Sequence, residues 1–197
     1  MEAGSQGMPG VHGGWRSRLV AMFVLGAVLG NSANALAATA QPGIGIPAQP
    51  GEQGAATATA RIVRAILEYT RWPKPVNPVE VCIVGTAGNG AAIEAISLSD
   101  GREVAVRYLA RDGFAASAGC DAYYLGALDA GAMRQWTARA HGGPVVTIAE
   151  RDPQCRSEAM FCMVYSPGKV SFRLNIDAVS RSGVRIDPRV LRIAKDR

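Results

Sequence analysis

Short apolar runs alternate with helix-like stretches through the middle of this 197-residue chain, and this alternation limits its fold more than any other feature. Runs such as 79–85 are apolar almost throughout, as buried strands are, whereas 102–109 alternates apolar and polar residues. Strands separated by helices predict a largely parallel sheet with helices on both faces. The expected strands are 79–85, 102–109, 120–126 and 143–150, and the expected helices are 58–73, 88–101 and 129–143.

The last part of the chain departs from this alternation. Stretches 159–165 and 169–175 predict two antiparallel strands joined by a turn at 166–168, followed by short helices at 176–183 and 187–196. The predicted fold class is therefore α/β: a three-layer sandwich with a largely parallel sheet flanked by helices and an antiparallel edge hairpin near the C-terminus.

The first residues have the layout of a secretory signal. Two arginines precede an apolar run at 19–29, and small residues follow at alternate positions, so cleavage is expected after Ala35 or Ala37. A membrane-spanning helix needs about twenty apolar residues, which makes this run too short for an anchor. We therefore expect residues 1–37 to be removed and the mature protein to lie in the periplasm.

Composition separates a leader from the folded body. Residues 38–58 are rich in Pro, Gly, Ala and Gln and carry a single charge, which predicts a flexible leader. The chain as a whole is 48% hydrophobic and 19% charged, which is ordinary for a protein with a sizeable core. We therefore expect one α/β domain over residues 59–197.

Four cysteines lie in the body, at Cys82, Cys120, Cys155 and Cys162. In an exported protein an even number favours disulfides, and four cysteines allow three connectivities. A four-cysteine zinc site or a redox-active pair would favour C-x-x-C spacing, which the chain lacks. Structural disulfides are therefore expected, and no metal site.

The remaining motifs make no positive case for an enzyme. The stretch "GTAGNG" (85–90) follows a strand but lacks G-x-G-x-x-G spacing, so a simple turn is favoured over an anion-binding loop. His12 lies in the predicted signal. His141 could act as a catalytic base, but the chain has no G-x-S-x-G motif and no H-E-x-x-H motif. We expect no catalytic residue and no cofactor. A periplasmic module that binds a small solute (a nucleotide or an amino acid) and a hydrolase using His141 remain alternatives.

The basic excess of the body lies at its C-terminal end. Residues 169–197 hold 8 basic and 3 acidic residues. Nucleic acid is not expected as a partner, because the chain has neither zinc-finger spacing nor an RNA-binding sheet motif. The alternatives are a solvated basic face or a surface that binds a protein partner. The candidate partner-binding residues are Arg173, Arg181, Arg185 and Arg189.

Several stretches together resemble the YfiR family of periplasmic proteins (DUF4154). They are "AILEYTRWP", "VCIVG", "CDAYYLG", "PVVTIAE" and "MFCMVYSPGKVSFRLNIDAVSRSGVRIDPRVLRIA", with the four cysteines. The resemblance covers about residues 60–195, and its most specific part is the closing motif from "KVSFRLN" onward. It implies a homodimer and two disulfides per chain, Cys82–Cys120 and Cys155–Cys162.

The resemblance also implies a non-enzymatic regulator. Proteins of this kind bind the periplasmic sensor domain of an inner-membrane diguanylate cyclase and repress it, which lowers cyclic di-GMP and biofilm formation. An outer-membrane, OmpA-like lipoprotein relieves the repression. Arg181 falls where the family has a functionally implicated arginine. Arg173 stands where the same surface cluster has an acidic residue, which is a departure from the family pattern.

Overall fold

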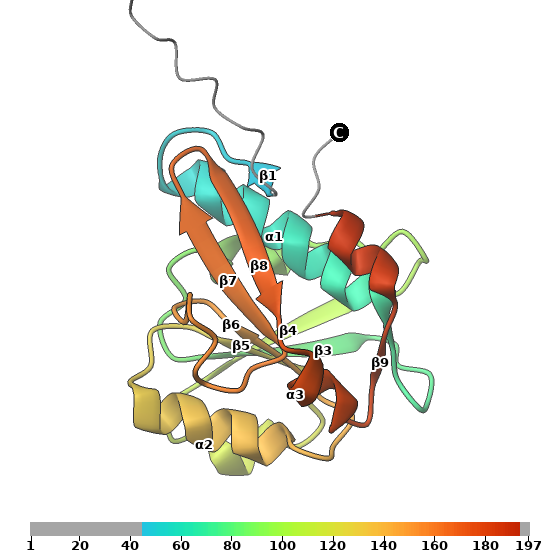
Figure 1. Cartoon of the computed structure of the whole chain (residues 1–197). Helices are drawn as coiled ribbons and strands as arrows, with labels where there is room; N and C mark the ends of the chain where they lie inside the picture. The colour runs from blue at the N-terminus through green and yellow to red at the C-terminus, as the bar shows by residue number, and fades with distance from the viewer. Residues whose placement is uncertain (1–44, 194–197) are drawn as a thin grey trace, which may run out of the picture. The chain divides into compact units, whose positions relative to one another are not determined.

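The structure, a computed structural model, describes residues 45–193 (Figure 1). The predicted signal peptide and the start of the leader lie outside the described residues. Among residues 45–193, no helix combines the length and the apolar character needed to cross a membrane.

Seven strands form one sheet in the order β1-β8-β7-β6-β5-β3-β4. The pairs from β7 through to β4 are parallel, whereas β8 runs antiparallel to both β7 and β1. This confirms the predicted α/β fold with its C-terminal hairpin. The strands are β1 (Ile46–Pro47), β3 (Val79–Val84), β4 (Val104–Leu109), β5 (Ala122–Leu125), β6 (Val146–Ala149), β7 (Phe161–Ser166) and β8 (Lys169–Leu174); a separate sheet pairs β2 (Thr70–Arg71) with β9 (Arg185–Ile186).

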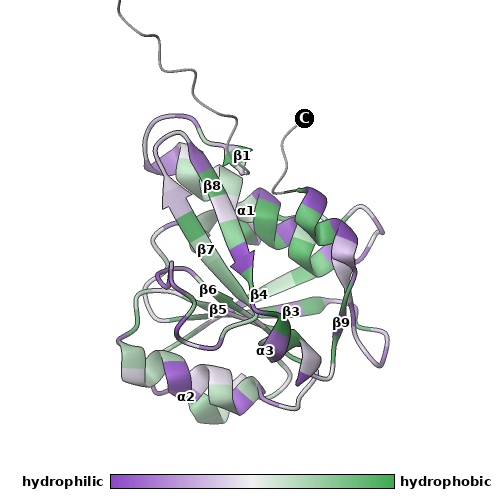
Figure 2. Ribbon diagram, in the orientation of Figure 1, coloured by the Kyte–Doolittle hydropathy of each residue, from purple (hydrophilic) through white to green (hydrophobic). Residues whose placement is uncertain are grey.

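Alternate residues of the central strands pack against opposite helical layers. Ile83 of β3 joins the core around Ile66, whereas its neighbours Cys82 and Val84 join the core around Trp136. Helices α1 (Glu52–Tyr69) and α2 (Ala130–Ala140) supply these layers and lie on opposite sides of the sheet (Figure 1). Polar and apolar residues alternate along α2, as in a helix with one buried face (Figure 2). The predicted three-layer arrangement is confirmed.

Two predicted helices are shorter and tighter than expected. The stretches 88–101 and 187–196 contain only the 3₁₀ helices η1 (Gly90–Ala95) and η3 (Pro188–Arg192) within the described residues. These turns close with i→i+3 hydrogen bonds, from the Ile96 amide to the carbonyl oxygen of Ile93 and from the Ile193 amide to that of Val190. A further 3₁₀ helix, η2 (Phe114–Ser117), and the short α-helix α3 (Ile176–Ser180) complete the fold.

Folded structure begins inside the stretch for which the sequence predicts a flexible leader. Ile46 pairs with Val170 of β8 and is 4% exposed, and α1 starts at Glu52 rather than after residue 58. The alanines of the first turns favour a helix, and the free edge of β8 offers Ile46 both hydrogen bonds and an apolar neighbour.

The sheet reverses its winding direction next to β3. The chain runs from β3 to β4 on one side and then to β5 on the other side of β3. In parallel sheets, the loops at the carboxyl ends of the strands beside such a point are the usual place for binding sites. Here these loops are 85–89 after β3, 126–129 after β5 and 150–160 after β6.

Candidate partner-binding surface

Both disulfides lie in the layer of the fold that contains α2. Cys82 is bonded to Cys120 and Cys155 to Cys162, the pairing that the family resemblance implies, and no described cysteine is free. The Cα–Cα separations of 5.8 and 5.4 Å suit disulfides. All four residues belong to or pack on the core around α2. Residues 155–162 are called the disulfide loop below.

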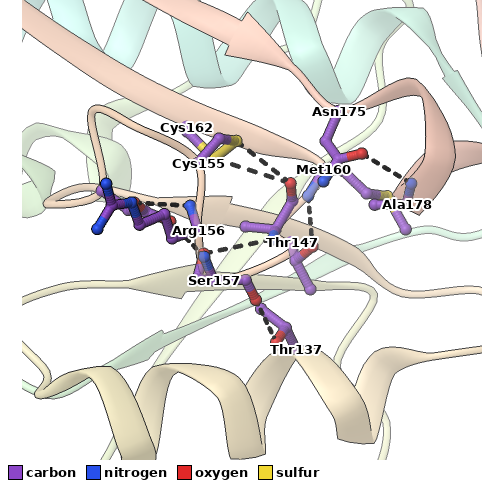
Figure 3. The surroundings of a disulfide bond; sticks show 11 residues. Thr137, Thr147, Cys155, Arg156, Ser157, Met160, Cys162, Asn175 and Ala178 are labelled. Carbon is purple, nitrogen blue, oxygen red and sulfur yellow. Dashed lines mark hydrogen bonds between the residues drawn. A yellow bond between two sulfur atoms is a disulfide. The ribbon is translucent and has the colours of Figure 1, made fainter.

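Three different elements hold the disulfide loop (Figure 3). The Thr137 hydroxyl of α2 donates a 2.6 Å hydrogen bond to the carbonyl oxygen of Ser157. The Met160 amide donates to the Thr147 hydroxyl of β6 at 2.9 Å. The Asn175 amide, just before α3, donates to the carbonyl oxygen of Met160 at 2.8 Å. The loop therefore connects α2, the sheet and α3.

The loop also has a strained backbone held by a carboxylate. Cys155 and Glu158 have φ values of 56° and 63°, a region that non-glycine residues seldom adopt. The Asp152 carboxylate accepts hydrogen bonds from the amides of Arg156 (3.0 Å) and Ser157 (2.6 Å). Partial burial raises the pKa of Asp152, but hydrogen bonds from Ser157 and neighbouring amides outweigh it and lower the pKa. Strained conformations persist where surrounding bonds determine them, as they do here.

An exposed surface forms where α3 meets this loop and the end of α2. Arg181, which caps α3, donates from Nε to His141 Nε2 at 2.8 Å, and its Nη2 lies 3.9 Å from the Glu158 carboxylate. Ile176, the first residue of α3, is 73% exposed. Arg173 is exposed on β8 directly opposite the loop's second cysteine in the strand register. These five residues are called the α3 surface.

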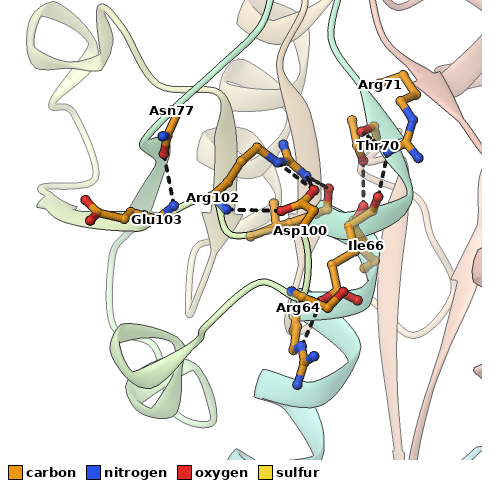
Figure 4. A network of polar contacts seen from close by, with 11 residues as sticks. Arg64, Ile66, Thr70, Arg71, Asn77, Asp100, Arg102 and Glu103 are labelled. Atoms are coloured by element: carbon orange, nitrogen blue, oxygen red, sulfur yellow. Dashed lines mark hydrogen bonds and ion pairs between the residues drawn. The ribbon is translucent and has the colours of Figure 1, made fainter.

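The other two candidate arginines lie elsewhere, beside the C-terminal end of α1. Arg185 of β9 is paired with Arg71 of β2, which Figure 4 shows at the end of α1. Arg189 forms an ion pair with Asp187 at 2.6 Å and covers the ring of Tyr69 at 5.5 Å. The structure therefore divides the four predicted arginines into two groups, and their role in binding a partner stays a prediction.

The glycine-rich loop after β3 binds a carboxylate of the protein itself. Glu150 directly follows β6, is 1% exposed, and accepts hydrogen bonds from the amides of Gly88 (3.0 Å) and Asn89. A side chain at Gly90 would collide with the ring of Tyr124 at 2.6 Å. The amides that could meet a ligand anion are thus occupied. Sequence reasoning missed Glu150; its only signal was an acidic residue at the end of an apolar run.

Within the described residues, the His141 side chain is hydrogen-bonded to an arginine and not to a serine. Its Nε2 atom accepts the hydrogen bond from Arg181, and the nearby Ser182 hydroxyl donates to the carbonyl oxygens of Val179 and Val184. In the same part of the chain, no cluster of three or more His, Cys, Asp or Glu side chains is arranged to hold a metal ion.

A family model described as YfiR/HmsC-like (DUF4154) matches residues 56–195. The match includes both disulfides, nearly all of α1 and the whole α3 surface. Since it covers more than half of the chain, the protein belongs to the YfiR/HmsC-like family.

Proposed function

We propose that this protein is a non-enzymatic periplasmic regulator. It binds the periplasmic sensor domain of an inner-membrane diguanylate cyclase and represses the enzyme, so that cyclic di-GMP and biofilm formation fall. An outer-membrane, OmpA-like lipoprotein captures the regulator and relieves repression, and the regulator acts as a homodimer. The observation that carries the proposal is family membership over residues 56–195.

The α3 surface supports a role in binding another protein. Ile176 is 73% exposed, and its helix also carries the charged Arg181. Protein interfaces commonly place an apolar anchor inside a rim of charged and polar groups. The disulfide loop and the Asn175 amide fix α3 against the sheet, so the anchor is presented by a pre-organised segment.

The central experiment compares a gene deletion with its complemented strain. Deletion is expected to raise cellular cyclic di-GMP and biofilm mass, and the wild-type gene is expected to restore both. Co-expression of the lipoprotein should reverse the effect of the restored gene. Unchanged cyclic di-GMP in the deletion strain would contradict the cyclase-repressor role.

Two matched variants locate the contact. Ile176→Asp places a charge at the proposed anchor and is expected to abolish repression, because burying an unpaired carboxylate in an interface is costly. Tyr108→Asp makes a similar change at another exposed apolar residue, 59% exposed on the edge strand β4, and should leave repression intact. Equal export and equal melting temperatures are required of both. Repression by the Ile176 variant at wild-type level would exclude the α3 surface.

A further inference from the structure

A cavity of about 200 Å³ lies between the loop after β5, the first turn of α2 and the loop after β6. Its apolar floor consists of side chains from the start of α2, among them the buried Met133. We call it the arginine cavity, because three of its lining residues are arginines. The lining residues are Leu128, Ala130, Met133, Arg134, Arg151, Asp152, Arg156 and Ser157.

The cavity occupies the position where sheets of this type bind ligands. It opens at the carboxyl ends of β5 and β6, next to the point beside β3 where the winding direction reverses. The loop after β3 cannot serve as the anion site there, because Glu150 binds the amides of Gly88 and Asn89. The arginine cavity lies next to this loop. Its lining carries more positive than negative charge, whereas the loop holds the Glu150 carboxylate.

The charge of the lining favours an anion. Three arginines and one carboxylate, Asp152, line the cavity, and that carboxylate accepts hydrogen bonds from the backbone amides of Arg156 and Ser157. Across residues 45–193, the ion pairs of the structure involve none of the three cavity arginines. The positive end of the α2 dipole adds to the same potential, although Asp129 caps that helix. The three arginines are exposed, so a ligand in the cavity can reach them.

We propose that the arginine cavity binds a small anionic solute that carries a carboxylate or phosphate group. Guanidinium groups bind both anions through paired hydrogen bonds, and the apolar floor accommodates a short hydrocarbon part. A volume of about 200 Å³ is below the range usual for drug-sized ligands, which favours a compact solute over a nucleotide. This inference goes beyond the proposed function, because binding of the anion does not depend on the cyclase and gives the regulator a small-molecule ligand.

The wall that carries Arg156 belongs to the disulfide loop, which hydrogen bonds connect to α3. An anion bound to this wall would stiffen the segment that supports the α3 surface. The cavity thus offers a physical route from a solute to the proposed interaction surface.

The test is calorimetric titration of the purified oxidised protein with inorganic phosphate and, separately, with succinate, at constant ionic strength set by sodium chloride. We expect saturable binding of one or both, and the preferred anion identifies the ligand class. Arg151→Ala/Arg156→Ala should weaken this binding by about tenfold or more, because charge-assisted hydrogen bonds are lost. The backbone amide signals of 128–134 and 151–157 should shift during an NMR titration.

The matched control is Arg61→Ala/Arg192→Ala, which removes the same charge from two exposed arginines outside the cavity. It should bind the anion as the wild type does, and both variants should keep the wild-type melting temperature without ligand. Equal weakening in the two variants would show general charge attraction and overturn the proposal. Absence of saturable binding to both anions would also overturn it. Because these titrations contain no cyclase, either result leaves the proposed repressor function unaffected.

Discussion

Glu150 has a buried carboxylate whose two oxygens bind backbone amides on the far side of β5. Burying such a group without hydrogen bonds would cost several kcal/mol, so the amides of Gly88 and Asn89 are what make the position tolerable. The same two bonds join the loop after β3 to the end of β6. The glycine-rich loop, which resembles an anion-binding loop, therefore binds Glu150 and helps to stabilise the fold.

Glu150→Gln is expected to lower the free energy of unfolding by about 1–3 kcal/mol, because the new amide group would face a backbone donor. Urea denaturation measures the effect. Glu103→Gln is the matched control: its side chain is exposed, and a change within about 0.5 kcal/mol is expected. Equal stability of the two variants would contradict the role assigned to Glu150.

The pair of Asp187 and Arg189 predicts a response to acid. The Arg189 side chain hydrogen-bonds the Asp187 carboxylate and lowers its pKa from 3.8 to about 2. Folding therefore favours the ionised form, and the resulting stabilisation is present above pH 3.8 and is lost as the pH falls towards about 2. Carboxyl carbon NMR should show this pKa directly. Arg189→Ala should return it towards 3.8, whereas the exposed neighbour Arg192→Ala should not; an unchanged pKa in the first variant would refute the assignment.

At the scale of elements, the α2 layer depends on covalent bonds more than the α1 layer does. One short helix and η2 cover this face of the sheet, and both disulfides lie within or against the core that they enclose. Trp136 anchors α2 by donating to the carbonyl oxygen of Arg111 at 2.7 Å and packing on Tyr123. Small cores in exported proteins commonly rely on disulfides in this way.

Removing each disulfide should therefore destabilise the protein to a different degree. The cysteines of the two pairs are 38 and 7 positions apart, and the chain-entropy model gives losses of about 3.9 kcal/mol for Cys82→Ala/Cys120→Ala and about 2.5 kcal/mol for Cys155→Ala/Cys162→Ala. Urea denaturation of both double variants tests the order. A larger loss for the shorter loop would mean that its strained backbone, rather than loop length, sets the cost.

At the scale of the whole molecule, the disulfide loop links stability to the proposed regulation. It contacts α2, β6 and the start of α3, and it lines part of the arginine cavity. The other disulfide joins β3 to Cys120, two residues before β5, and no hydrogen bond among the described residues connects it to α3. The Cys155–Cys162 disulfide therefore supports the start of α3, whereas the Cys82–Cys120 disulfide holds β3 to the segment before β5.

We predict that Cys155→Ala/Cys162→Ala is exported and folded but represses poorly, because the support of the α3 surface is lost. Cys82→Ala/Cys120→Ala should repress well at a temperature where it remains folded, although it is the less stable variant. Cyclic di-GMP in complemented deletion strains measures both. Normal repression by the first variant would separate the disulfide loop from the interaction surface.

Much of the fold could be predicted because it depends on local pattern. Each strand from β3 to β8 lies where the sequence predicts one, since buried strands need continuous or alternating apolar residues. The 3₁₀ form of the turns at η1 and η3 could not be predicted, because the same apolar spacing in so short a segment is compatible with 3₁₀ and with α-helical hydrogen bonding. The start of folded structure at Ile46 depends on the edge of β8, which lies more than a hundred residues later.

The sequence by itself determined the fold class, the cysteines available for disulfides and the family, because periodicity, cysteine number and contiguous motifs are readable along one dimension. Only the tertiary structure decided that Glu150 occupies the glycine-rich loop, that the four candidate arginines form two groups, and that Arg134, Arg151 and Arg156 line one cavity. Most of these features bring together segments that are separate in the chain, and the spatial order of the strands in the sheet decides which segments become neighbours.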